Sequence, residues 1–450
     1  MATALLLALS PLAKAETRAP AIPSQPLTLS DCIALALQES PLLEASRFDV
    51  ASATEEARAA RSQNLPEITA TGTAEIFSGS PTSKFSVVNL GETPAGLAIN
   101  QNNVNLGAVE IYSAHLRYPL FKDGSILGLN TSPAVASKEA RKQNLAWTTR
   151  LRREDVIDRI TDAYITTVSA ENRSSYAARR VDLLEQQVSI TQEQQKQGLM
   201  LPIDLKLAQS QLSGARTLAK ILRQQAVAGE IEIARALGFD SPAELHLSNA
   251  LPEPPEPPTA EQLLAKSSLG QHPSLQVQRQ VTEQARQDYR LERFRLYPSV
   301  TLDGTATHID DFSPASAEIY TGSITVSVPV FDFGAQLATT RGKLAKYSAE
   351  RARVLSVADD VTFQIETIYQ SIYVLSQNIL SLQQEVAKVD RDLQVISSQQ
   401  QQGIAPPLTA IEKELLLIAK RDDLDGLLVR RLTRYAALQK AAGGAWKWIQ

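Results

Sequence analysis

Residues Tyr297 to Ala306 read YPSVTLDGTA, and the chain contains a second version of this stretch, LPEITATGTA, from Leu65 to Ala74. Aligning Pro66 with Pro298 also matches Ile68 with Val300, Thr69 with Thr301, Gly72 with Gly304, Thr73 with Thr305 and Ala74 with Ala306. An internal repeat of this kind indicates a duplicated structural unit. The two copies therefore predict a chain built from two related halves.

Both copies alternate with a period of two residues, as a strand does when its two faces meet different surroundings. One face carries Thr69, Thr71 and Thr73 in the first copy, and Asp303 and Thr305 in the second. The opposite faces carry Ile, Val, Leu, Ala and Gly. A single strand of this kind also fits a soluble core, so the surrounding sequence has to decide.

Length and composition limit how the chain can contact a membrane and which partners it can have. The chain has 450 residues and a formal net charge of -4. It contains no apolar run near the roughly 18 residues that a spanning helix needs. Any membrane contact is therefore expected to use strands, and the acidic balance does not indicate a nucleic-acid partner. Cys32 is the single cysteine, which excludes an intrachain disulfide, and its apolar helical setting places it in the core.

Residues 1 to 15 have an apolar stretch followed by the small-x-small site Ala13-Lys14-Ala15, which is typical of a secretory signal peptide cleaved after Ala15. A short buried helix is the alternative. Beyond it we expect a first repeat at 16–250, a proline-rich linker at 251–258, a second repeat at 259–441 and a tail at 442–450.

Each repeat opens with an amphipathic helix. Thr28 is expected to cap the first one and Asp31 to complete a capping box, with Thr259 in the corresponding place of the second repeat. Pro41 and Pro273 divide these helical stretches into two stacked pieces, because proline cannot donate within a helix.

Prolines also mark the strands. Pro66 and Pro298 stand at the junctions where a helix gives way to a strand, and Pro119 and Pro329 are expected to end the second strand of each repeat. A long polar loop, 80–107, separates the two strands of the first repeat, whereas the loop of the second repeat is short.

Two very long helices follow the strand pairs. They are predicted from Pro133 to about Gln197 and from Ala335 to Gln402, and each spans on the order of 100 Å. Each ends at a glycine turn, and a return helix of about half that length follows, Ile203 to Leu237 and Leu408 to Ala441. Four strands per chain cannot close a barrel, so a barrel would require a small oligomer.

The order of these elements resembles the TolC family of outer membrane efflux proteins over nearly the whole mature chain. The motifs that carry the resemblance are LTLSDCIALALQESPLL, the junctions LPEIT and YPSVT, the strand exits YPLF and VPVFDFG, and the turns QKQGLMLPIDLKLAQSQL and QQQGIAPPLTAIEKELL. None of these motifs is specific alone. Their order, spacing and duplication, taken together, are specific.

The resemblance implies a mainly α fold with a small β part, in which long helices form a periplasmic barrel. Each chain of a homotrimer would add four strands to one transmembrane β-barrel in outer-membrane lipid. The implied function is a passive exit duct for a tripartite efflux or type I secretion system. The implied partners are a periplasmic adaptor and an inner-membrane pump of the RND, ABC or MFS class. Strand alternation fits an apolar outside and a polar lumen.

In the family, acidic residues shortly after the glycine turns constrict the pore. The sixth residue after Gly198 is Asp204, but the sixth after Gly403 is Thr409, and only the ninth, Glu412, is acidic. This departure from the pattern leaves Glu412 and Asp204 as gate candidates. Because Lys413 follows Glu412, an ordinary solvated helix position is an equal alternative for that residue.

The turns Gly198-Leu199 and Gly403-Ile404 match the positions where family members meet the helical hairpin of the adaptor. An apolar residue beside a C-terminal glycine can instead make the hydrophobic contact of a Schellman cap, so both interpretations stay open.

The sequence contains no recognisable catalytic motif. The histidines His115, His246, His272 and His308 have no metal-ligand spacing, and neither a P-loop nor a GxSxG or HExxH motif occurs. We therefore expect no enzyme activity, no cofactor and no metal. The alternative to a channel is a periplasmic coiled-coil scaffold or tether, which strict heptads would favour.

Overall fold

The computed structural model describes residues 26–76, 108–237, 247–248, 251–266, 268–311, 317–444 and 446–448. The predicted signal peptide and the loop 80–107 lie outside these ranges.

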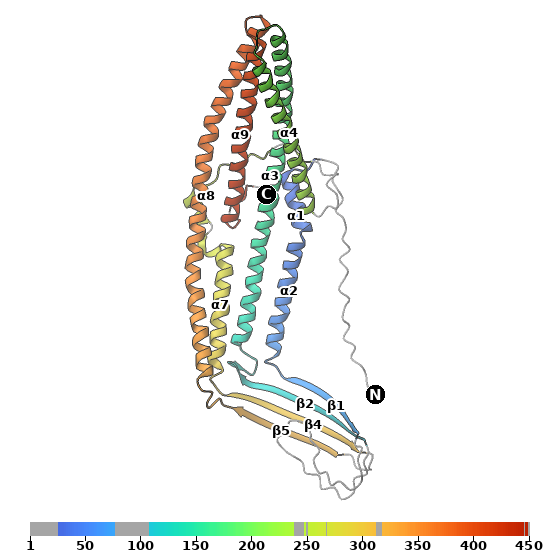
Figure 1. Cartoon of the computed structure of the whole chain (residues 1–450). Helices are drawn as coiled ribbons and strands as arrows, with labels where there is room; N and C mark the ends of the chain where they lie inside the picture. Colours follow the sequence, from blue (N-terminus) through green and yellow to red (C-terminus); the bar gives the residue numbers. More distant parts are fainter. Residues whose placement is uncertain are drawn as a thin grey trace. The chain divides into compact units, whose positions relative to one another are not determined.

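The first half of the described chain contains two short helices, a strand pair, a long helix and a return helix (Figure 1). Their bounds are α1 (Leu29–Glu39), α2 (Pro41–Ser62), β1 (Glu67–Ile76), β2 (Ala108–Lys122), β3 (Ser125–Ile126), α3 (Pro133–Lys196) and α4 (Pro202–Ala236).

The second half has a similar order, with three short helices in place of two and no described counterpart of β3. Its elements are α5 (Ala260–Lys266), α6 (Ser268–Gln271), α7 (Pro273–Phe294), β4 (Ser299–Asp311), β5 (Ala317–Ser327), α8 (Ala335–Gln401) and α9 (Pro407–Ala441). The predicted ends of the long helices and of the return helices agree with the structure to within one residue. They agree because glycine and proline punctuate the chain at these points.

The chain forms two compact units, and each takes segments from both halves. We call them the helical unit, Met1–Phe48, Trp147–Gln276 and Leu355–Gln450, and the sheet unit, Asp49–Ala146 and Val277–Val354. The compact units therefore do not coincide with the sequence repeats.

The core of the helical unit lies between α1, α3 and α4, where Cys32, Tyr164 and Ile233 are buried. The predicted capping boxes start its short helices. Thr28 and Asp31 bond reciprocally at the start of α1, and Thr259 and Gln262 do so before α5. These bonds satisfy backbone N–H groups that a helix start leaves free.

The sheet unit contains an antiparallel sheet with strand order β1-β2-β4-β5. The two repeats meet at β2 and β4, where Ala114 pairs with Ala306. Pro66 and Pro298 directly precede β1 and β4, and Pro329 follows the end of β5 by two residues. Figure 1 shows the four strands side by side.

The prediction that Pro119 ends its strand is wrong. β2 runs on to Lys122, and its pairing with β4 shifts register between Pro119 and Phe121. A bulge lets the strand continue past a residue without an N–H group. The chain then turns at Asp123-Gly124 into β3, an additional short strand that pairs with the end of β2.

Among the described helices, none is both long enough and apolar enough to cross a membrane.

Candidate functional site

The register of the sheet sorts the strand residues into two faces, because directly paired residues point the same way. On one face, which we call the polar face, Thr69, His115, Thr305 and Thr321 share a row. His115 Nδ1 lies 3.2 Å from Thr305 Oγ1. The expected lumen residues Thr69, Thr71, Thr73, Asp303 and Thr305 all lie on this face.

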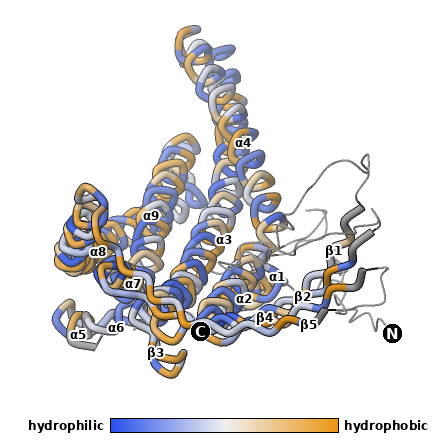
Figure 2. Tube along the Cα trace, turned by 90° about the horizontal axis from the view of Figure 1, so that it is seen from below, coloured by the Kyte–Doolittle hydropathy of each residue, from blue (hydrophilic) through white to orange (hydrophobic). Residues whose placement is uncertain are grey.

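The opposite face, the apolar face, has rows such as Ala70, Ala114, Ala306 and Tyr320. Its large side chains are open to solvent in the single chain: Ile68 is 76% exposed and Tyr320 is 75% exposed. Figure 2 shows hydrophobic and hydrophilic residues interspersed along the strands. Exposed large apolar side chains on one face of a sheet are typical of a protein or membrane contact.

Both edges of the sheet are available for pairing. β1 pairs only with β2, and β5 pairs only with β4, within the part of the chain that the structure describes. Each edge strand therefore presents a row of backbone N–H and C=O groups to another chain. The sheet thus has the two features that a barrel shared between chains requires, a polar face beside an apolar one and two free edges.

The two glycine turns have the same backbone geometry and lie at the same end of the helical unit (Figure 1). Gly198 and Gly403 both have φ of 75°, which suits glycine. Leu199 N donates to Gln194 O at 2.8 Å, and Ile404 N donates to Gln399 O at 2.9 Å, as in a Schellman motif.

The side chains beside these glycines do not pack down onto the helices. Leu199 is 72% exposed and Ile404 is 69% exposed. The hydrophobic contact that often accompanies a Schellman cap is therefore not their role in the single chain. Two exposed apolar side chains are left at the tips.

The two gate candidates differ in their surroundings. The Asp204 carboxylate accepts a hydrogen bond from Leu201 N at 3.0 Å, so it caps the start of α4. Glu412 is exposed on the first turns of α9. The neighbouring Lys413 lies 3.9 Å from Asp392 of α8, so this lysine is directed along the hairpin toward another acid.

A buried polar cluster between α3 and α9 was missing from the sequence-based prediction. Asp425 is only 6% exposed and accepts a hydrogen bond from Ser169 Oγ at 2.6 Å. Arg173 Nε pairs with the neighbouring Asp422 at 2.6 Å. Burial raises the pKa of Asp425, and the Ser169 hydrogen bond opposes that rise. This cluster joins the α3–α4 hairpin to the α8–α9 hairpin within the helical unit.

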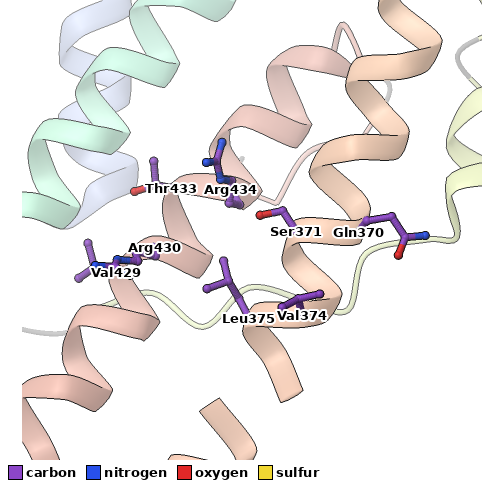
Figure 3. Close-up of a pocket in the computed structure, with 8 residues that line it drawn as sticks. All are labelled: Gln370, Ser371, Val374, Leu375, Val429, Arg430, Thr433 and Arg434. Carbon is purple, nitrogen blue, oxygen red and sulfur yellow. The ribbon is translucent and has the colours of Figure 1, made fainter. Parts of the chain in front are cut away.

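A shallow groove of about 600 Å³ runs between α8 and α9. Figure 3 shows the lining side chains, among them Ser371 and Leu375 of α8 and Arg430, Thr433 and Arg434 of α9. Its lining contains no acid, histidine or cysteine. The Ser371 and Thr433 hydroxyls of the lining therefore have no carboxylate or imidazole beside them in the groove.

The described residues contain no group of three or more acidic, histidine or cysteine side chains that could hold a metal ion. His115 and His308 lie on strands, and His246 falls outside the described ranges. His272 Nε2 donates to Ala441 O at 3.0 Å, and burial lowers the pKa of this imidazole. His272 thus ties the start of α7 to the end of α9.

Comparison with known proteins gives a family and a fold. Residues 32–239 and 264–444 match the family model "Outer membrane efflux protein". The pyoverdine export outer membrane protein OpmQ of Pseudomonas aeruginosa is 22% identical over 299 residues, 64% of this chain. This chain spans 61% of the length of that relative.

Solved structures share the fold at low sequence identity. The outer membrane protein VceC of Vibrio cholerae superposes with a TM-score of 0.71 at 17% identity, over 92% of this chain and 96% of VceC. The CmeC outer membrane channel of Campylobacter jejuni gives 0.77 at 11% identity, over 94% of this chain and 87% of CmeC. The open-state MtrE channel of Neisseria gonorrhoeae gives 0.72 at 16% identity, over 94% and 90%.

These matches confirm the predicted TolC-like resemblance, the fold class and the location in the outer membrane with a large periplasmic helical part. The matched proteins are described as membrane channels or export proteins rather than enzymes. Because the family model covers both halves of the chain, this protein belongs to the outer membrane efflux protein family.

Proposed function

We propose that this chain is the outer-membrane exit duct of a tripartite efflux or type I secretion system and conducts its cargo passively. The observation that carries the proposal is the two-faced sheet. It has a polar face, an exposed apolar face and two free edges, and it adjoins long helices in the sheet unit. Strands of this kind suit a wall between lipid and water.

The proposed duct is a homotrimer. Lipid offers no partner for backbone N–H and C=O groups, so the free edges of β1 and β5 have to pair. Four long strands are too few to enclose a lumen, and three chains supply enough. In the closed barrel, β5 of one copy would pair with β1 of the next, and the polar faces would line the lumen.

The proposed partners are a periplasmic adaptor and an inner-membrane pump of the RND, ABC or MFS class. The exposed Leu199 and Ile404 at the tips support docking of an apolar surface there. Because the relative OpmQ is a pyoverdine exporter at only 22% identity, its cargo is no guide to the cargo of this chain.

Glu412, and with it Asp204, is the proposed periplasmic gate. Threefold symmetry would repeat each exposed Glu412 carboxylate around the pore and attract cations. Asp204 already caps α4, so we expect it to add less to the gate than Glu412 does.

Conductance across a planar bilayer tests this function. The purified protein should form discrete cation-selective channels, and Glu412→Gln should lower the cation-to-anion permeability ratio by about twofold. Gln402→Glu, which adds an exposed acid near the same turn, serves as a control for charge alone and should not lower the ratio. A protein that assembles and inserts but never conducts would instead be the scaffold alternative. Unchanged selectivity of Glu412→Gln would reject Glu412 as the gate.

A further inference from the structure

One row of the polar face carries charges of both signs. Glu67 pairs with Arg117 in the β1–β2 ladder, Arg117 pairs with Asp303 in the β2–β4 ladder, and Asp303 pairs with Ser323. These four residues therefore form one line across the sheet. The register places further charged residues on this face only near the strand ends: Glu75 and Asp311 in the row of Val109, and Lys122 beyond the bulge.

The row lies toward the end of the sheet where β1 and β4 begin and where β2 and β5 end. Glu67 is the first residue of β1, directly after Pro66, and Arg117 precedes the bulge at Pro119. In a closed barrel the row would thus lie at the end that adjoins the helices. Beyond it, the rows of Thr69 and Thr71 carry hydroxyl and imidazole groups.

The contacts within the row place the charges close together. Arg117 Nε lies 3.1 Å from Asp303 Oδ1, and Thr301 Oγ1 donates to Asp303 Oδ2 at 3.2 Å. The Arg117 side chain is well exposed, so water screens this pair and its contribution to stability is small. Two acids face one base, which leaves the row with a net negative charge.

We infer that this row forms a ring of alternating charge inside the barrel and adds to the cation preference of the proposed Glu412 gate, with Arg117 holding that preference at a moderate level. The inference rests on the proposed function, since it needs the barrel to close. A wall with net negative charge raises the local concentration of cations. The favoured cargo class is therefore small organic cations and zwitterions rather than organic anions.

Charge-neutral substitutions at the two paired residues give opposite expected effects. Arg117→Gln leaves both acids without their counter-charge, so the cation-to-anion permeability ratio should rise about twofold. Asp303→Asn leaves one acid against one base, so the ratio should fall by a similar factor. The double variant Arg117→Gln/Asp303→Asn restores the original net charge and should return the ratio to the wild-type value.

Reversal potentials of single channels measure these ratios, first in a potassium chloride gradient and then with tetraethylammonium as the cation. Low ionic strength, on the order of 0.01 M, keeps the charges from being screened. Glu318→Gln removes an exposed acid from the apolar face and is the matched control. It should leave the ratio unchanged. Size-exclusion chromatography of each variant confirms that it still assembles.

The experiment distinguishes a failure of the proposed function from a failure of the charged ring. If the wild-type protein does not conduct, the proposed function fails. If it conducts but Arg117→Gln and Asp303→Asn leave the reversal potential unchanged, the duct stands and the charged ring is rejected. A shift in the same direction for both variants would also overturn it, because opposite charges were removed.

Discussion

At the scale of single residues, Phe333 has a backbone conformation that its side chain does not favour. It has φ of 53° and is followed by Gly334 at 82°. In the first repeat, Asp123 and Gly124 have the same geometry, with φ of 53° and 81°. Aspartate tolerates the left-handed region, whereas a bulky residue there is strained by roughly 1 kcal/mol. The second repeat thus keeps the turn and places an aromatic residue in it.

Phe333→Asn should therefore stabilise the protein by about 1 kcal/mol, because asparagine adopts positive φ more easily. The Phe333 side chain is 93% exposed and contacts the ring of Phe331, so its removal costs little burial in the single chain. Thermal unfolding followed by circular dichroism measures the gain. Phe331→Asn, at a residue without positive φ, is the control and should bring no gain.

A lower unfolding temperature for Phe333→Asn would contradict this account of strain. It would mean that the ring of Phe333 makes a contact in the assembled protein that outweighs the cost of its backbone conformation.

Sequence patterns predict residues whose partners are close in the chain. The capping pair Thr28 and Asp31 could be read from a spacing of three residues, and the structure confirms it. The buried bond between Ser169 and Asp425 could not, because it depends on how α3 packs against α9. The lumen and gate residues remain predictions, since their roles exist only in an assembled pore.

At the scale of elements, the sequence predicted those helix ends that local backbone chemistry determines. The ends of α3 and α8 follow from glycine at φ of 75° and from proline after it. The course of β2 did not follow from Pro119, because whether a proline ends a strand or sits in a bulge depends on the partner strand. β3 is only two residues long, too short for any periodic pattern to reveal it.

The prediction at this scale concerns the two glycine turns, where we propose that the adaptor docks. Replacing Leu199 and Ile404 together by glutamate should abolish transport in cells, because an apolar docking surface would then have to bury two charges per chain. Both residues are exposed, so trimer formation and channel conductance should persist. Antibiotic or dye accumulation measures transport, and native electrophoresis measures assembly.

The matched control is methionine at both positions, which keeps an apolar side chain of similar size and should retain at least about half of the transport. Transport that survives the glutamate pair would show that the adaptor docks elsewhere on the helices.

At the scale of the whole molecule, the repeats predicted the element order but not the compact units. Each unit draws on both repeats, because β2 pairs with β4 and because α3 packs against α9. Such pairings join residues that are far apart in the chain. A repeat pattern shows that two halves are alike, but it does not show how they pack together.

The alternation of the sheet gives the last prediction, which tests the barrel as an assembly. Thr305 shares a row with His115 on the polar face, and the next residue, Ala306, shares a row with Ala114 on the apolar face. In a lipid-embedded barrel only the first row meets water. Cysteine at Thr305 should therefore react with a membrane-impermeant maleimide at least about ten times faster than cysteine at Ala306, because hydrocarbon excludes both the reagent and the thiolate.

The native thiol does not obscure this comparison. Cys32 is fully buried, and burial raises its pKa to about 12, so little thiolate forms at neutral pH and the unsubstituted protein provides the blank. Measured in proteoliposomes, equal rates at the two positions would mean that both faces of the sheet meet water. A strand wetted on both faces cannot be the wall of a lipid-embedded barrel, so that result would reject the duct and leave the periplasmic scaffold as the explanation of the long helices.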